Sequence, residues 1–73
     1  METLTTEQIA QNYTAALDSV TVITELMALD TRDAEQTATV ARNVEHLKLM
    51  VAKDYWTTED LAPLNAAITA GIA

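Results

Sequence analysis

The chain has 73 residues, no cysteine and a net charge of −7, which together exclude several classes of protein. The length allows a single domain, here residues 1–73. Without cysteine there is no disulfide, no catalytic thiol and no cysteine-ligated zinc. Because phosphate contacts need Lys and Arg, we expect neither nucleic-acid binding nor attraction to an anionic membrane surface. The only bases are Arg32, Arg42, Lys48 and Lys53.

The composition is typical of long helices. Hydrophobic residues make up 49% of the chain, and a single Gly and a single Pro leave few positions for turns. The sequence begins METLTTEQ, in which no secretory signal is visible, and the longest apolar run, residues 20–29, is too short to span a bilayer. We therefore expect an all-α protein in the cytoplasm, or in a particle assembled there.

The first helix is predicted over residues 6–29. Thr5 and Gln8 have the spacing of a capping box, in which each side chain bonds the other residue's backbone N–H. Apolar positions then recur at helical spacing, and Leu17 widens the face that they form. The stripe is Ile9, Tyr13, Ala16, Val20, Ile23 and Met27.

The second helix is predicted over residues 32–55, after a polar break. Either Asp30 or Thr31 can cap it, which places Asp33 in its first turn. Two long helices with a short linker predict an antiparallel hairpin with Val20, Val44 and Leu47 buried between them. The stripe of the second helix is Thr37, Val40, Val44, Leu47, Val51 and Tyr55.

A short third helix is predicted over residues 59–70, capped by Thr57 or Thr58. Proline is comfortable only in a first turn, so Pro63 implies either that the regular helix begins near Asp60 or that a single tight turn precedes it. Gly71 is the predicted helix stop. The apolar stripe is Leu61, Leu64, Ile68 and Ile72. The expected fold is this hairpin plus third helix, as part of an oligomeric bundle.

The residues that could carry catalysis do not form a recognisable site in the sequence. His46 shares the polar side of its helix with Arg42 and Lys53, which predicts a surface histidine. Ser19 has no His or Asp placed to activate it. There is no Gly-rich loop to hold a phosphate. We therefore expect no enzymatic activity, no metal site and no cofactor.

The first helix and its flanks contain acidic residues but no base. Glu7, Asp18 and Glu25 lie within about 20° of one another on a helical wheel, and we call them the acidic ridge. They are too far apart along the axis to act as a catalytic pair. The ridge is either a solvated face or a docking surface for a basic partner.

Both long helices have more apolar residues than one buried stripe requires. A third helix that folds back accounts for Leu26 and Leu29, but not for Leu49 and Met50 as well. Trp56 either packs at the turn into the third helix or anchors an interface. This surplus predicts self-association as a dimer or trimer, or binding to another protein. The candidate interface is Val22, Leu26, Leu29, Leu49, Met50 and Trp56.

Residues 43–50, NVEHLKLM, and residues 52–61, AKDYWTTEDL, resemble small uncharacterised proteins of tailed bacteriophages, including cyanophages. The resemblance covers about a quarter of the chain and contains no catalytic motif. It implies a phage origin and a component of the virion.

Two functions follow from these observations. The first is a non-enzymatic structural or assembly protein that acts through helix–helix contacts, located in a host cytoplasm or a virion. The alternative is an acidic inhibitor or adaptor that masks the basic nucleic-acid-binding surface of a partner protein, a reading based on the base-free first helix and the charge of −7. A metal-binding or small-molecule-binding bundle is disfavoured because no polar ligands converge.

Overall fold

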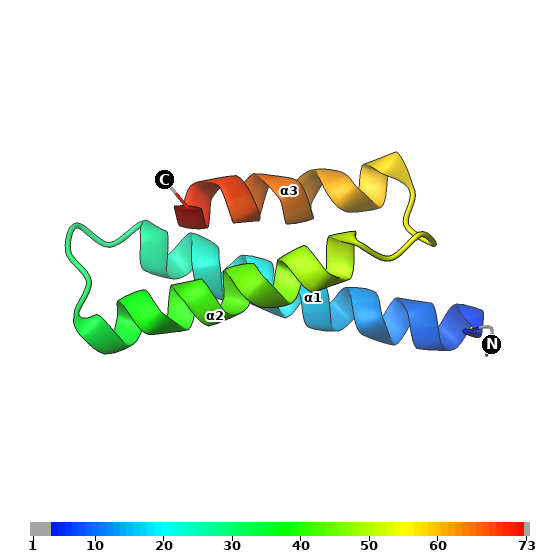
Figure 1. Ribbon diagram of the computed structural model, residues 1–73, viewed down its shortest axis with the longest axis horizontal. Helices are drawn as coiled ribbons and strands as arrows, with labels where there is room; N and C mark the ends of the chain where they lie inside the picture. Colours follow the sequence, from blue (N-terminus) through cyan, green and yellow to red (C-terminus); the bar gives the residue numbers. More distant parts are fainter. Residues whose placement is uncertain (1–3, 73) are drawn as a thin grey trace.

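The computed structural model describes residues 4–72, which form three α-helices and no strand (Figure 1). Helix α1 spans Thr6–Met27, α2 spans Ala34–Val51 and α3 spans Thr58–Ile72. The molecule is elongated, with extents of 42 × 21 × 16 Å. The all-α fold class predicted from the sequence is confirmed.

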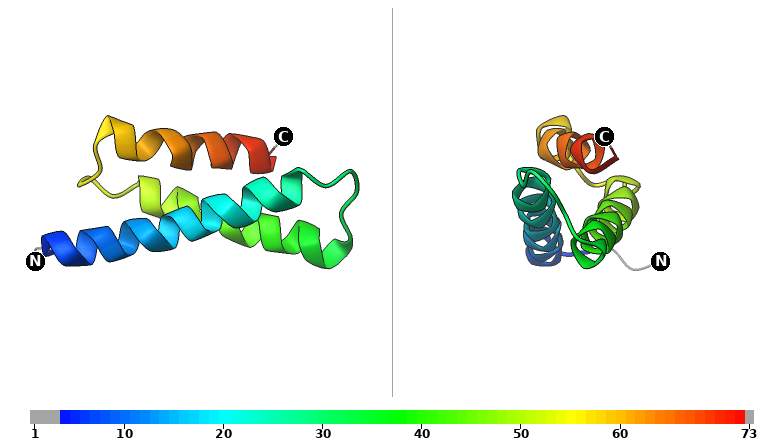
Figure 2. Two further views of the ribbon diagram at one scale, coloured as in Figure 1. Left: turned by 180° about the vertical axis from the view of Figure 1, so that it is seen from behind. Right: turned by 90° about the vertical axis from the view of Figure 1, so that its left-hand side faces the viewer.

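The three helices pack as a triangle when the molecule is viewed along its length (Figure 2). Helices α1 and α2 form the predicted antiparallel hairpin, and they cross as they pass. Helix α3 runs back in the direction of α1 and contacts both helices of the hairpin. The third helix therefore covers one side of the hairpin and leaves the opposite side open.

Each helix begins with a pair of reciprocal hydrogen bonds. The Gln8 N–H donates to Thr5 Oγ1 over 3.1 Å, and the Thr5 N–H donates to Gln8 Oε1 over 2.9 Å, as predicted. For α2 the cap is Asp33, whose carboxylate accepts from the Gln36 N–H at 2.7 Å, so the prediction of Asp30 or Thr31 was wrong. Of Asp30, Thr31 and Asp33, only Asp33 has a Gln three residues later, so only Asp33 can complete a capping box.

The start of α3 follows the same rule. The Asp60 N–H donates to Thr57 Oγ1 over 3.1 Å, and the Thr57 N–H donates to Asp60 Oδ2 over 3.2 Å. Thr57, one of the two caps considered, is therefore the cap, and the helix begins at Thr58.

Helix α1 ends at Met27, two residues before the predicted end. The Arg32 guanidinium, from the connection to α2, donates to the Leu26 carbonyl over 3.2 Å and to the Leu29 carbonyl over 3.1 Å. A cation beside the last carbonyls also favours the negative end of the helix dipole. The Leu29 N–H also donates to the Leu26 carbonyl, so the guanidinium adds a further donor at this helix end.

Helix α2 ends at Val51, four residues before the predicted end. The Trp56 indole N–H donates to the Met50 carbonyl over 2.7 Å, and the Lys53 N–H reaches the same oxygen over 3.1 Å. The chain therefore turns immediately after Val51, and the tryptophan closes the helix end.

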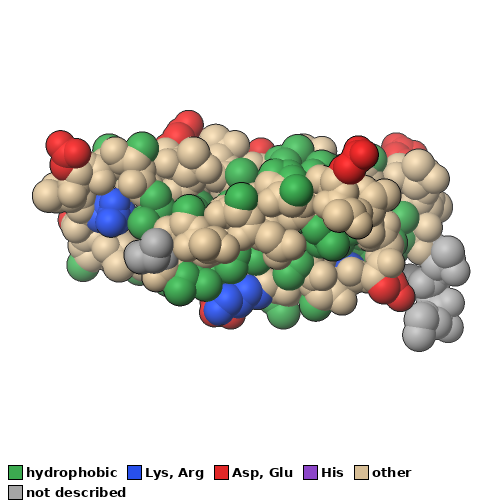
Figure 3. Space-filling model, turned by 90° about the horizontal axis from the view of Figure 1, so that it is seen from above, with side chains coloured by type: hydrophobic (Ala, Val, Ile, Leu, Met, Phe, Trp, Pro, Cys, Tyr) green, Lys and Arg blue, Asp and Glu red, His purple; other side chains and the backbone are tan. Residues whose placement is uncertain are grey.

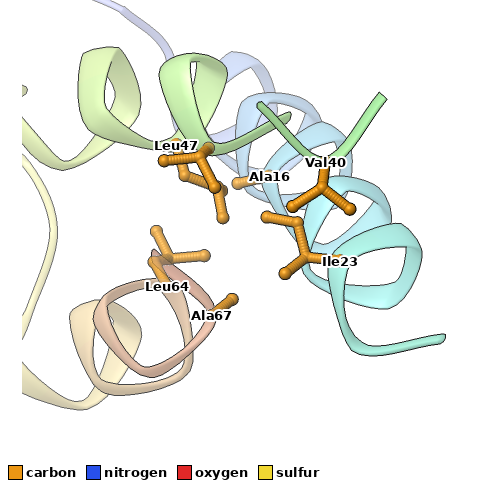
Figure 4. Packing of buried hydrophobic residues seen from close by; sticks show 7 residues of the cluster. Ala16, Ile23, Val40, Leu47, Leu64 and Ala67 are labelled. Carbon is orange, nitrogen blue, oxygen red and sulfur yellow. The ribbon is translucent and has the colours of Figure 1, made fainter. Parts of the chain in front are cut away.

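The core contains one fully buried large side chain from each helix, namely Ile23, Leu47 and Leu64 (Figure 4). Val44 and Leu47 are buried as predicted, whereas Val20 lies partly buried at the edge. Small residues at contact points let the helix axes approach one another. The full cluster is Ala16, Ile23, Val40, Val44, Leu47, Leu64 and Ala67.

Two residues of α3 behave differently from the predictions. Pro63 lies inside the helix rather than in its first turn, and the carbonyl that loses its donor belongs to the exposed Glu59. Gly71 does not stop the helix, which continues through it without a positive φ. A Cβ at Gly71 would overlap Val44 Cγ2 and come within 3.4 Å of Ile23 Cγ2. Gly71 is needed for close packing.

Leu47→Ala tests the core. Leu47 is fully buried, so its truncation should lower the free energy of unfolding by about 2–5 kcal/mol, measured by thermal or urea denaturation. Leu49→Ala is the matched control, because Leu49 is 68% exposed and should change stability by no more than about 0.5 kcal/mol. Equal effects of the two changes would contradict the assigned core.

Gly71→Ala tests the close approach of α3. Alanine gains about 1 kcal/mol of helix propensity, but overpacking against Val44 costs about 1–3 kcal/mol, so we expect a net loss of stability. The double variant Gly71→Ala, Val44→Ala should lose less stability than the sum of the losses of the two single variants, because Val44→Ala removes the methyl group that a Cβ at position 71 would overlap. Strict additivity in this double-mutant cycle would argue against the contact.

Candidate functional site

An aromatic cluster joins α1 to the connection between α2 and α3. Trp56 is only 9% exposed, and its ring centroid lies 5.3 Å from that of Tyr13 and 4.5 Å from that of Tyr55. Both distances are typical of favourable aromatic pairs. Trp56 therefore packs at the turn into α3, and it is not an exposed anchor in the candidate interface.

Hydrogen bonds fix this cluster on α1. The Tyr13 hydroxyl donates to the Asp60 carbonyl over 3.0 Å, and the Asn12 amide donates to the Tyr55 hydroxyl over 3.3 Å. Burial and, secondarily, the nearby Asp60 carboxylate raise the pKa of Tyr13 above its ordinary value. The cluster is a structural junction at one end of the bundle.

The structure brings Ser19 and His46 together, contrary to both sequence predictions. Ser19 Oγ lies 2.7 Å from His46 Nδ1, and Ser19 is only 5% exposed. The histidine is half-buried against α1 instead of projecting from the polar surface. Sequence reasoning missed the pair because it assigned each residue to a face of its own helix, whereas the contact depends on how α1 and α2 are aligned.

The chemical environment of this pair is that of a structural hydrogen bond. A serine nucleophile needs a histidine oriented by a third group, together with donors for an oxyanion. Within residues 4–72, His46 has no side-chain hydrogen bond other than that to Ser19. Ser19 lies in the middle of α1, where backbone N–H groups bond within the helix. The contact joins α1 to α2 and sets their relative register.

The acidic ridge faces solvent. Glu7, Asp18 and Glu25 are all exposed, and in the described part of the chain none of them forms an ion pair. The single ion pair there joins Lys48 to Glu45 over 3.5 Å, on the surface of α2. In the isolated chain the ridge is therefore a solvated row of carboxylates, available to a partner.

The remaining candidate interface residues differ in exposure. Leu49 is 68% exposed and Leu29 is 42% exposed, so α3 does not cover Leu29 as expected. Leu26 and Met50 are half-buried and pack against the core, and Val22 is also half-buried. Two further apolar residues, assigned to buried stripes by their spacing, are exposed as well: Leu17 at 38% and Ile72 at 62%.

The outer surface of α3 carries no charge after its first turn. Residues 61–72 contain no Asp, Glu, Lys or Arg, and the exposed positions are mostly small. Seen from this side, charged side chains lie toward the edges of the molecule, and the middle is uncharged (Figure 3). This surface offers little that could select a partner.

Tyr13→Phe tests the partly buried hydroxyl and its hydrogen bond to Asp60. Because the folded-state pKa is raised, the stability that Tyr13 contributes is complete below the unfolded pKa of about 10 and is lost as pH rises through the folded value. At neutral pH the variant should have a free energy of unfolding lower by about 0.5–1.5 kcal/mol, because it lacks the hydrogen bond. Above pH ~10 its stability should fall less steeply with pH than that of the wild type. Parallel curves in thermal melts from pH 8 to 11.5 would contradict this account.

In residues 4–72, no group of three or more His, Cys, Asp or Glu side chains converges to hold a metal ion. No helix in that range is both long enough and apolar enough to cross a membrane. In comparisons with known proteins, no family model, no curated protein and no solved structure matches this chain.

Proposed function

We propose that the protein is a non-enzymatic structural or assembly protein that works through helix–helix contacts with other protein chains, including further copies of itself. The observation that carries this proposal is the set of large apolar side chains that stay exposed after all three helices have packed. Leu49 is the clearest case, at 68% exposed in the last turn of α2. Isolated exposed leucines are common, but four large hydrophobics in so small a chain favour an interface.

The accessible surface supports the same proposal. It measures 5116 Å² for a chain of 7.9 kDa, whereas a monomeric protein of that mass exposes about 4,400 Å². The excess of about 700 Å² is close to the roughly 800 Å² that each partner buries in a standard interface. A dimer or trimer would remove this excess.

The setting that we propose is a phage particle or its assembly. The support is the resemblance of residues 43–50 and 52–61 to proteins of tailed bacteriophages. These residues form the second half of α2, the Trp56 junction and the start of α3.

The acidic ridge supports a second candidate function, that of an inhibitor or adaptor. Glu7, Asp18 and Glu25 are exposed on a helix without any base, so they could face the basic nucleic-acid-binding surface of a partner. Such an interaction should form fast and weaken steeply with salt.

Two variants distinguish these functions. Leu49→Asp places a charge in the exposed apolar position, and should abolish self-association measured by light scattering at micromolar concentration. The triple variant Glu7→Gln, Asp18→Gln, Glu25→Gln removes ridge charge, and should weaken self-association far less than Leu49→Asp does, because exposed charges are screened.

The opposite pattern would favour the adaptor. In that case wild-type chain would be monomeric, and its capture of a basic partner would survive Leu49→Asp but be lost with the triple Gln variant and in high salt. Both variants change exposed residues only, so unaltered thermal melts are the control for folding.

A further inference from the structure

The open side of the hairpin is identified by the contacts of α3. Gly71 of α3 packs against Ile23 of α1 and Val44 of α2, so these two residues mark the covered side. At about 100° per residue, Ser19 lies between Ile23 and Val22 around α1. Leu47 likewise lies between Val44 and His46 around α2. Val22 and His46 therefore belong to the side away from α3, where the Ser19–His46 contact joins the helices.

This open side has an acidic row on α1 and a row on α2 in which Arg42 is the base and the acid Glu35 lies seven residues before it. Each row steps by four and then three residues, which keeps its members in line along the helix. Asp18, Glu25, Arg42 and Leu49 are exposed, whereas Val22 and His46 are half-buried in the seam. We call the two rows together the hairpin face: Asp18, Val22 and Glu25 from α1, and Arg42, His46 and Leu49 from α2.

We propose that a second copy of the chain packs on the hairpin face in a two-fold dimer, with α1 of each copy against α2 of the other. This inference rests on the proposed function and specifies its partner and contact. A two-fold axis parallel to the helices brings the acidic row over the partner's α2. An axis perpendicular to them would place α1 on α1 and acid on acid, and such like-charge contacts disfavour assembly.

The Ser19–His46 contact sets the register of the dimer. It holds residues 19 and 46 at the same height in helices that run in opposite directions. Rotation about an axis parallel to the helices preserves these heights. Six residues along α1 from Ser19, Glu25 then comes to a height between the partner's Thr39 and the partner's Arg42, and Asp18 comes level with the partner's His46. The apolar Val22 lies between Asp18 and Glu25 in its row, and Leu49 lies at the opposite end of the face from Glu25.

The crossing of the hairpin helices suits this arrangement. In Figure 1 each of α1 and α2 descends away from α3 toward its own N-terminal end. Rotation about the long axis places the N-terminal half of α1, which lies far from α3, beside the C-terminal half of the partner's α2, which lies close to the partner's α3. The N-terminal half of α2 is likewise placed beside the C-terminal half of the partner's α1. The two faces then fit along their length, with four helices in contact across the interface.

Charge reversal tests the pairing of Glu25 with the partner's Arg42. Arg42→Glu and Glu25→Arg should each weaken the dimer by about tenfold or more in sedimentation equilibrium at ~150 mM salt, because each creates two like-charge contacts. The first change makes the net charge more negative and the second makes it less negative, so a net-charge effect cannot weaken both. An equimolar mixture of the two variants, and a chain carrying both changes, should return to within about threefold of the wild-type Kd.

Lys48→Glu is the matched control. It makes the same charge change on α2 but lies outside the hairpin face, and it should change the Kd by no more than about threefold. A dimer that is indifferent to both reversals, or is lost only on Ala66→Glu in the outer surface of α3, would overturn this interface while leaving assembly as the function. A wild-type chain that stays monomeric at millimolar concentration would overturn self-association altogether.

Discussion

The close approach of α3 to the hairpin is the contact on which the rest of the structure depends. A hairpin of two helices buries only one side of each, and a core of this size stabilises a fold by only a few kcal/mol. Gly71 lets the end of α3 lie directly on Val44 and Ile23, while Leu64 enters the centre of the core. Tyr13 and Trp56 hold the other end of α3 in place. With both ends fixed, the third helix completes the core and determines which side of the hairpin stays open.

The helix ends explain how a chain with one glycine and one proline can turn twice. Each helix starts with reciprocal side-chain and backbone bonds, which satisfy N–H groups that have no partner within the helix. At their ends, Arg32 and Trp56 bond carbonyl oxygens of α1 and α2. In both connections, side chains bond the last carbonyl groups of the preceding helix, so no glycine is needed at these helix ends.

The hairpin face follows from this division of roles. Because α3 occupies one side, the acidic row of α1 and the Arg42 row of α2 remain on the other, joined by the partly buried hydrogen bond between Ser19 and His46. The acidic ridge and the apolar surplus were two competing clues in the sequence. In three dimensions Asp18, Glu25 and Leu49 lie on the open side of the hairpin, so in the dimer that we propose, charge and apolar contact would act in one interface.

The sequence by itself determined the helical class, the three segments and the central core residues Val44 and Leu47, because helical periodicity and capping are local properties. It also contains the Asp33–Gln36 pair, whose capping-box spacing marks the start of α2. Only the tertiary structure decided that Ser19 meets His46, that Gly71 is a packing residue and that Ile72 is exposed. These outcomes depend on the alignment of one helix against another, and the pattern within a single helix does not encode that alignment.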